Sequence, residues 1–131
     1  MMGTTNIEII ELATCLSIFN FNCICEDEFK GIIKQNPTNI IVNLNDTYKN
    51  VNGHWCLCFI DNEQKIYYSS YGDPSLIEVK QYMMEIDDRL ILSSNFQIQD
   101  FNEDTCGLYC ILLLFLLNDK IKFEDMIISF V

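Results

Sequence analysis

Three segments of the chain have apolar residues at the spacing that is typical of a helix. Residues 5–14 form the first, with Asn6 as a candidate N-cap, and a second segment follows Pro74. The third spans Cys106–Asn118, where Thr105 is a good N-cap and nearly every side chain is apolar. We therefore expect this last helix to lie at the centre of the fold. The apolar positions expected to face the core are Ile7, Ile10 and Leu12 in the first segment and Leu76, Val79 and Met83 in the second.

The segments between these helices have the patterns of strands. Residues 40–42 are β-branched, and side chains alternate over residues 55–61, so two strands joined by a turn-rich loop are expected. A polar turn at residues 61–64 leads into residues 65–68, which predicts a hairpin directly after the first pair. Residues 90–99 alternate weakly and complete the predicted strands.

Length and composition place these elements in one domain. The chain has 131 residues, half of them hydrophobic, and no Pro/Gly-rich linker or internal repeat divides it. A single α+β domain spanning residues 1–131 is therefore expected. The longest apolar run, residues 107–117, is shorter than the roughly 20 residues that cross a bilayer, so no membrane partner is expected.

Charge and cysteine content narrow the class of partner and the compartment. Asp and Glu number 19 against 8 Lys and Arg, a formal charge of −11, whereas nucleic-acid binding depends on basic side chains. Nucleic acid is therefore not expected as a main partner. Seven cysteines lack the spacing of a disulfide framework, and no signal peptide is recognised ahead of them, so a reducing environment is expected.

Four residues could carry nucleophilic chemistry. His54 is the only histidine, and Cys106 stands where a helix is predicted to begin, a position that favours the thiolate. Gly107 would let a substrate backbone approach, and Gln99 could join a backbone N–H in donating to an oxyanion. Three of them also have an ordinary interpretation: His54 as a strand histidine, Cys106 as an inert buried cysteine and Gln99 as a loop glutamine. Position alone does not decide between the two interpretations.

Taken together and in order, these motifs resemble the adenovirus-type cysteine proteases, the adenain family, which shares a clan with proteases specific for SUMO and other ubiquitin-like modifiers. The resemblance spans most of the chain, and four motifs in the right order are more specific than any one of them. The matching segments are Ile41-Val42-Asn43, Gly53-His54-Trp55, Tyr67-Tyr68-Ser69-Ser70-Tyr71-Gly72, Gln99 and Cys106-Gly107-Leu108-Tyr109-Cys110.

The resemblance implies a papain-like fold, with the cysteine on a central buried helix packed against a small, mostly antiparallel sheet that carries the histidine. It implies that Cys106 is the nucleophile, His54 the general base and acid, and Gln99 an oxyanion donor. Trp55 and Gly107 would border the substrate, although Trp55 could equally be an ordinary core residue. The implied activity is thiol endopeptidase cleavage of viral capsid or core precursors at Gly-containing sites.

The same resemblance implies where and with what the protein acts. Polypeptide substrates are its expected partners, in the host cytoplasm or nucleus and inside the virion. We expect a monomer that needs no metal, no cofactor and no nucleic acid, because a charge of −11 is poorly suited to binding a polyanion. Whether a partner peptide activates the enzyme stays open, since the spacing of the N-terminal cysteines singles out none of them.

The chain departs from the family at the position of the catalytic acid, which Ser69 occupies. Serine can accept a hydrogen bond from imidazole but brings no negative charge. A thiolate and an imidazolium stabilise each other, so a Cys-His dyad tolerates this loss better than a serine enzyme would. Asp73 and Asp61 are the nearest alternative carboxylates, and neither stands at the motif position.

Three other interpretations remain. His54, Cys56 and Cys58 would share one face of a strand, but a rise of about 3.3 Å per residue spreads them too far apart for one tetrahedral zinc. An isopeptidase for ubiquitin-like modifiers would use the same cleft, yet 131 residues leave little surface for such a partner. A catalytically silent virion protein on the same fold is supported only by Ser69.

Overall fold

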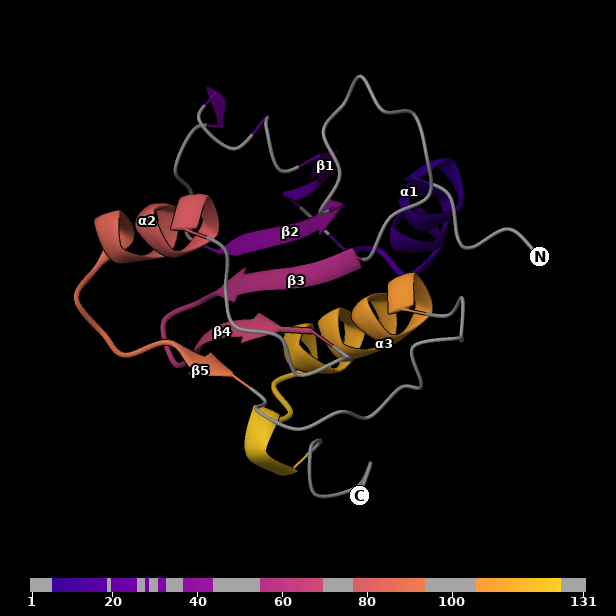
Figure 1. The fold of residues 1–131 in the computed structure, drawn as a ribbon. Coiled ribbons are helices and arrows are strands. Elements are labelled where there is room, and N and C mark those ends of the chain that lie inside the picture. The colour runs from indigo at the N-terminus through magenta and orange to yellow at the C-terminus, as the bar shows by residue number, and fades with distance from the viewer. Residues whose placement is uncertain are drawn as a thin grey trace.

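The computed structural model describes residues 6–18, 20–25, 28, 31–32, 37–43, 55–69, 77–93 and 106–125. They form a mixed α+β structure in which helices cover a five-stranded sheet (Figure 1). In chain order the elements are α1 (Asn6–Cys15), β1 (Phe21–Cys25), β2 (Thr38–Asn43), β3 (Trp55–Ile60), β4 (Lys65–Tyr68), α2 (Ile77–Ile86), β5 (Leu92–Ser93) and α3 (Cys106–Asn118).

The strands lie in the sheet in their chain order, β1-β2-β3-β4-β5. The two central pairings are antiparallel and confirm the strands and the hairpin predicted from the alternating pattern. The two outer pairings, β1 with β2 and β4 with β5, are parallel. The sheet is therefore mixed, whereas the family resemblance implied a mostly antiparallel one. Residues 94–99 of the predicted strand region lie outside the described residues.

Two hydrophobic clusters occupy the two faces of the sheet. Helices α1 and α3 cover one face and pack on Trp55, Leu57 and Phe59 of β3. Helix α2 covers the other face and packs on the alternate residues Cys56 and Cys58. All six residues of β3 are buried, because both faces of this strand are covered by helices.

Helix α1 has the predicted position but buries a different face. Its core contacts are Ile9 and Ala13, one turn apart, whereas the predicted positions Ile7, Ile10 and Leu12 are exposed. The small Ala13 side chain lets the helix approach the sheet closely, and Ile9 fills the space one turn away. The prediction of the buried face of this helix was therefore wrong.

Helix α3 has the bounds predicted from its apolar run, but it is not enclosed. Its sheet-facing residues Leu113 and Leu114 are fully buried, while Leu108, Leu112 and Phe115 on the opposite side are exposed. The helix covers one face of the sheet. The sequence predicted that it would lie at the centre of the fold, and it does not. In the described part of the chain, no helix is long and apolar enough to cross a membrane.

Helix α1 ends in a tight capping turn that returns the chain to the sheet. Ser17 has a positive φ of 57°, and the Ile18 N–H donates to the Ala13 carbonyl at 3.0 Å. This is the hydrogen-bond pattern of a Schellman motif, with serine in the left-handed position that glycine usually takes. Lys120, with a φ of 67°, has the equivalent position after α3.

Candidate functional site

At one end of the sheet, the start of α3, whose first residue is Cys106, meets the start of β3, whose first residue is Trp55. The Cys110 thiol, in the second turn of α3, donates to the Trp55 main-chain carbonyl at the start of β3, with 3.4 Å between sulfur and oxygen. At the other end of α3, the Asn118 amide donates to the Asn39 side-chain oxygen of β2 at 3.0 Å. These two contacts align α3 with β3, so that both elements begin at the same end of the sheet (Figure 1).

The structure describes only part of the predicted catalytic set. Cys106 is the first residue of α3, as expected from its capping pattern, and its side chain lies outside the described residues. His54, Gln99 and Asp73 also lie outside them. The described neighbours in sequence are Trp55, which directly follows His54, and Gly107, which directly follows Cys106.

Both described residues of the predicted substrate site are buried. The Trp55 side chain is only 3% exposed and packs in the cluster between β3 and α3. Of its two interpretations, this burial favours the core residue over a residue that contacts substrate. Gly107 is buried in the first turn of α3.

Ser69, the residue predicted from the resemblance to stand in place of a catalytic acid, directly follows β4 and is 1% exposed. Leu57 pairs with Tyr68, so one further step of the antiparallel register sets Ser69 opposite Cys56. Ser69 therefore lies just beyond the end of β4, close to the end of the sheet where α3 begins. The second strand of the hairpin thus provides a buried hydroxyl at the motif position.

Asp61 lies at the wrong end of β3 to orient His54. Six residues at about 3.3 Å each separate it from Trp55 along the strand, about 20 Å in all. Its Oδ1 accepts the main-chain N–H groups of Glu63 and Gln64 at 2.8 and 2.7 Å, and its Oδ2 lies 3.7 Å from Lys120 Nζ. Asp61 is therefore a turn residue that shapes the β3–β4 hairpin.

The cysteines divide into packed and accessible groups. Cys56 and Cys58 share one face of β3, as their alternation predicts, and both are fully buried with α2. Burial raises the pKa of Cys58 far above that of an ordinary thiol, and burial together with Cys25 and Glu28 raises that of Cys23 to about 12. None of the six described cysteines forms a disulfide, and Cys15 is the exposed one among them.

Within the described ranges, these cysteines do not form a metal centre with other ligands. No group of three His, Cys, Asp or Glu side chains suited to a metal ion occurs among the residues that the structure describes. The burial of Cys56 and Cys58 in an apolar cluster explains their side chains as core packing. Packing likewise accounts for Cys110, whereas Cys15 at the end of α1 is accessible.

The contact of Cys110 with β3 was not predicted from the sequence. Cys110 appeared in the sequence only as the last member of the Cys-Gly-Leu-Tyr-Cys motif. Its spacing of four from Cys106 would have indicated it, because residues one turn apart lie on the same helix face. In the structure its thiol is the hydrogen-bond link between α3 and β3.

Comparison of the sequence with models of protein families gives no match. The search of curated proteins also finds no matching protein.

Proposed function

We propose that this chain is a cysteine endopeptidase with a papain-like, adenain-type fold, in which Cys106 is the nucleophile and His54 the general base and acid. The order of the sequence motifs suggests the roles. The structural observation that supports them most is the hydrogen bond from the Cys110 thiol to the Trp55 carbonyl. Each partner in that contact stands close in sequence to one of the proposed catalytic residues.

The contact supports the proposal through the positions of its two partners along the chain. Cys106 precedes Cys110 by four residues, about 6 Å of helical rise, and His54 immediately precedes Trp55. The proposal also requires the chain to leave strand geometry before Trp55. Trp55 faces α3. If the strand continued regularly towards the N-terminus, the preceding residue, His54, would face the opposite side of the sheet, which α2 covers. Gly53, directly before the histidine, provides the backbone freedom for such a departure.

The chemistry would proceed through a thioester. The Cys106 thiolate, favoured at the helix N-terminus, attacks the scissile carbonyl, and the Gln99 amide and a backbone N–H donate to the oxyanion. The His54 imidazolium then protonates the departing amine, which leaves the acyl group on sulfur. Finally, His54 takes a proton from water, the resulting hydroxide attacks the thioester, and the acid product and the thiol are released.

The catalytic pair would work as a dyad, with Ser69 in place of the family acid. Asp61 is committed to the β3–β4 turn, so it does not supply the missing charge. A thiolate–imidazolium pair carries its own compensating charges, and a buried hydroxyl is sufficient to orient the ring. By the family resemblance, the substrates would be viral structural precursors cleaved at Gly-containing sites.

The proposal is tested by labelling the purified chain with a Gly-Gly vinyl sulfone and locating the adduct by peptide mass spectrometry. We expect modification at Cys106 and none in Cys106→Ala. Cys15→Ala is the matched control, because Cys15 is exposed and would react with any soft electrophile. Labelling confined to Cys15, or no labelling of the wild-type chain, would contradict the catalytic assignment.

A second arm examines the missing acid. If Ser69 stands next to the catalytic imidazole, Ser69→Asp should increase the rate of labelling, because a carboxylate stabilises imidazolium. Ser69→Asn has a similar size without the charge and separates this effect from loss of packing. Equal labelling rates for Ser69→Asp and Ser69→Asn, with both variants folded, would show that position 69 is not next to the imidazole.

A further inference from the structure

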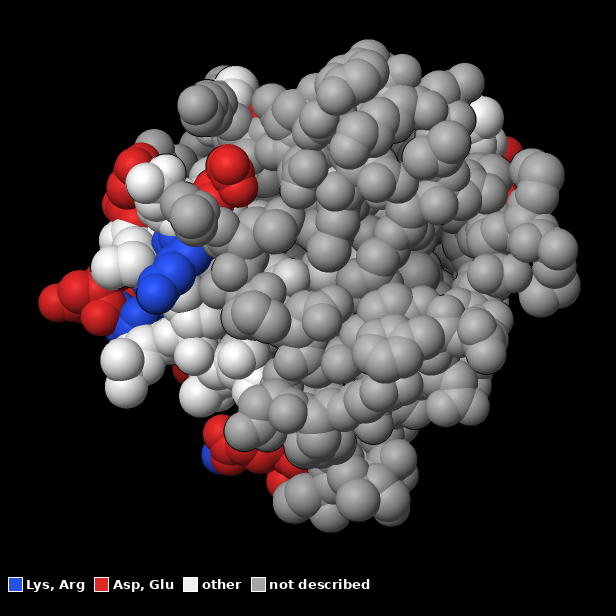
Figure 2. All heavy atoms as spheres, in the orientation of Figure 1, with Lys and Arg blue, Asp and Glu red and all other residues white. Residues whose placement is uncertain are grey.

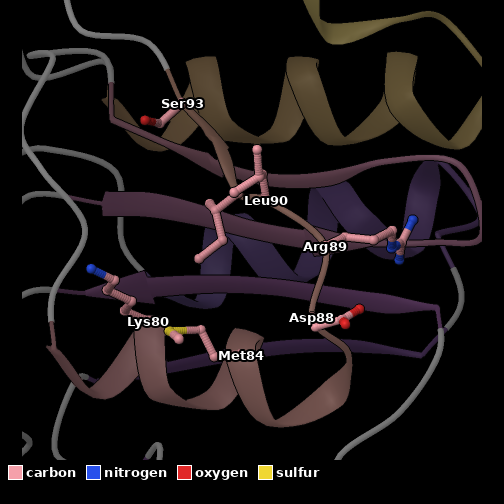
Figure 3. A pocket seen from close by; sticks show the side chains of 7 residues that line it. Lys80, Met84, Asp88, Arg89, Leu90 and Ser93 are labelled. Atoms are coloured by element: carbon pink, nitrogen blue, oxygen red, sulfur yellow. The ribbon is translucent and has the colours of Figure 1, made fainter.

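A groove lies between α2 and the chain that leads into β5, away from the end of the sheet at which α3 begins. It has a volume of about 440 Å³ and is lined by Lys80 and Met84 of α2 and by residues 88–91 and Ser93. Figure 3 shows the two walls: α2 contributes one and the segment after it the other. Lys80 stands at one end of the groove and Asp88 towards the other.

The middle of this groove is apolar and open to solvent. Leu90 is 87% exposed and Met84 is 59% exposed, although both are large hydrophobic side chains. Beside them, Ile91 is half-buried and packs on the cluster beneath α2. Such neighbouring exposed apolar side chains, framed by charged ones, are typical of an interaction site.

Charge at the ends of the groove indicates the polarity of its occupant. Lys80 makes no ion pair with any described residue, and the α2 residues three or four positions from it, residues 77, 83 and 84, are all apolar in sequence. In a chain of charge −11, an unpaired ammonium beside an apolar surface suits a carboxylate from outside. Figure 2 shows the basic and acidic side chains close together at the edge formed by α2.

The two charged groups at the other end differ in their availability. Asp88 is exposed and makes no ion pair among the described residues. Arg89 is engaged: its Nε and Nη2 donate to the Asp87 carboxylate at 3.1 and 2.8 Å, and Nη2 also donates to the Asp61 carbonyl at 2.7 Å. The available charge at this end is therefore the negative one of Asp88.

Beside the groove, β5 offers an edge for backbone pairing. Its residues Leu92 and Ser93 pair with β4 on one side only, and β5 is the last strand of the sheet among the described residues. An extended peptide added to such an edge presents alternate side chains to the same face.

We propose that this groove binds an extended peptide segment of the pattern acidic-x-apolar-x-basic, with the acidic residue at Lys80 and the basic one at Asp88. From Lys80 to Ile86, the last residue of α2, the helix rises about 9 Å, and Asp88 lies two residues further along the chain. In an extended peptide of five residues, the first and the fifth lie four steps apart, about 13 Å, and the first, third and fifth side chains share one face. The central apolar side chain then covers Met84 and Leu90. This function goes beyond the proposed protease activity and does not depend on it.

The test measures the fluorescence anisotropy of a fluorescein-labelled peptide, Ser-Glu-Thr-Leu-Thr-Lys-Ser, titrated with the full chain. We expect saturable binding that weakens about fivefold to tenfold in Lys80→Glu, where an ion pair is replaced by a like-charge contact. The same variant should prefer Ser-Lys-Thr-Leu-Thr-Lys-Ser, which restores opposite charges. Lys122→Glu changes charge equally at an exposed residue outside the groove and should bind like wild type.

Two further arms separate the outcomes. Replacing the central leucine of the peptide by serine should abolish saturable binding, because the contact with Met84 and Leu90 is lost. Cys106→Ala should bind the peptide as the wild-type chain does. No saturable binding of the Glu-Leu-Lys peptide by the wild-type chain would overturn the proposal. Equal losses of affinity in Lys80→Glu and Lys122→Glu would also overturn it, since only net charge would then matter.

Discussion

Lys65 is a buried cation whose removal should destabilise the fold far more than removal of an exposed one. It is 2% exposed, and its Nζ donates to the main-chain carbonyls of Asp87 and Arg89 at 2.7 and 3.2 Å and to the Asp87 carboxylate at 3.2 Å. These bonds join β4 to the chain that follows α2. The ammonium therefore satisfies two carbonyls that close the end of this helix.

The expected loss in the free energy of unfolding can be estimated from the interactions that Lys65→Met removes and those that it keeps. The methionine keeps most of the apolar stem, so the loss falls on the hydrogen bonds of the ammonium. A hydrogen bond to a charged group contributes about 1.5–3 kcal/mol, and removing the desolvated ammonium offsets part of the total. We expect a net loss of about 2 kcal/mol in the free energy of unfolding. With a urea m-value near 1.5 kcal/mol/M, the midpoint should fall by about 1–2 M.

Urea unfolding followed by Trp55 fluorescence measures this loss, because Trp55 is the only tryptophan and lies in the core. Lys120→Met is the matched control. Lys120 also faces a carboxylate, Asp61 at 3.7 Å, but its side chain is 69% exposed, so its loss should cost less than about 0.5 kcal/mol. Equal midpoints for the two variants would refute the reasoning that burial decides the contribution of Lys65.

Two further predictions concern α3 and the Asp87 carboxylate. Leu113→Ala should lower the free energy of unfolding by about 2–5 kcal/mol, because Leu113 is fully buried against the sheet. Leu112→Ala, at the exposed neighbouring residue, should lower it by less than about 1 kcal/mol. Urea midpoints compare the two variants, and similar losses of stability would contradict the orientation of α3. The Arg89 hydrogen bonds hold the pKa of Asp87 well below its usual range, so this carboxylate contributes stability above its unfolded pKa of about 3.9 that is lost as pH falls through the lower folded value. Between pH 5 and about 2, Asp87→Asn should therefore lose stability less steeply than wild type, as urea midpoints across this range would show. Parallel curves for the two proteins would contradict this linkage.

The parts of the fold that could be predicted from the sequence are those with local signals. The β3–β4 hairpin follows from the alternation over residues 55–61 and the polar turn at residues 61–64, in which the Asp61 side chain accepts the main-chain N–H groups. Helix α3 begins after Thr105 and ends at Asn118, so its capping and polar residues give its bounds. In these elements, neighbouring residues contain the whole signal.

The features that could not be predicted depend on contacts between distant segments. Strand β1 pairs in parallel with β2, beginning with Phe21 opposite Asn39, and its five residues are all half-buried, so no alternation marks it. Helix α3 is apolar on every side, so its sequence does not indicate which side faces the sheet. The burial of Lys65 depends on Asp87, 22 residues away.

The candidate site shows the same division. The helix start at Cys106 follows from local capping and is confirmed, whereas the meeting of α3 with β3 depends on Cys110 and Trp55, which are 55 residues apart. Pattern alone also left two interpretations of Trp55 equal. The structure favours the core interpretation because α3 covers that face of β3.

Strand β3 separates the two proposed sites and makes them independent of each other. Its first residue, Trp55, contacts α3, while Asp61 after its last residue accepts a hydrogen bond from Arg89, which lines the groove. The distance between these ends, about 20 Å, exceeds the 7–10 Å or so within which substitutions usually influence each other. A substitution in the groove therefore tests peptide binding without altering the thiol chemistry, and Cys106→Ala tests the chemistry without altering the groove. Labelling at Cys106 without peptide binding, or peptide binding without labelling, would each overturn one proposal and leave the other standing.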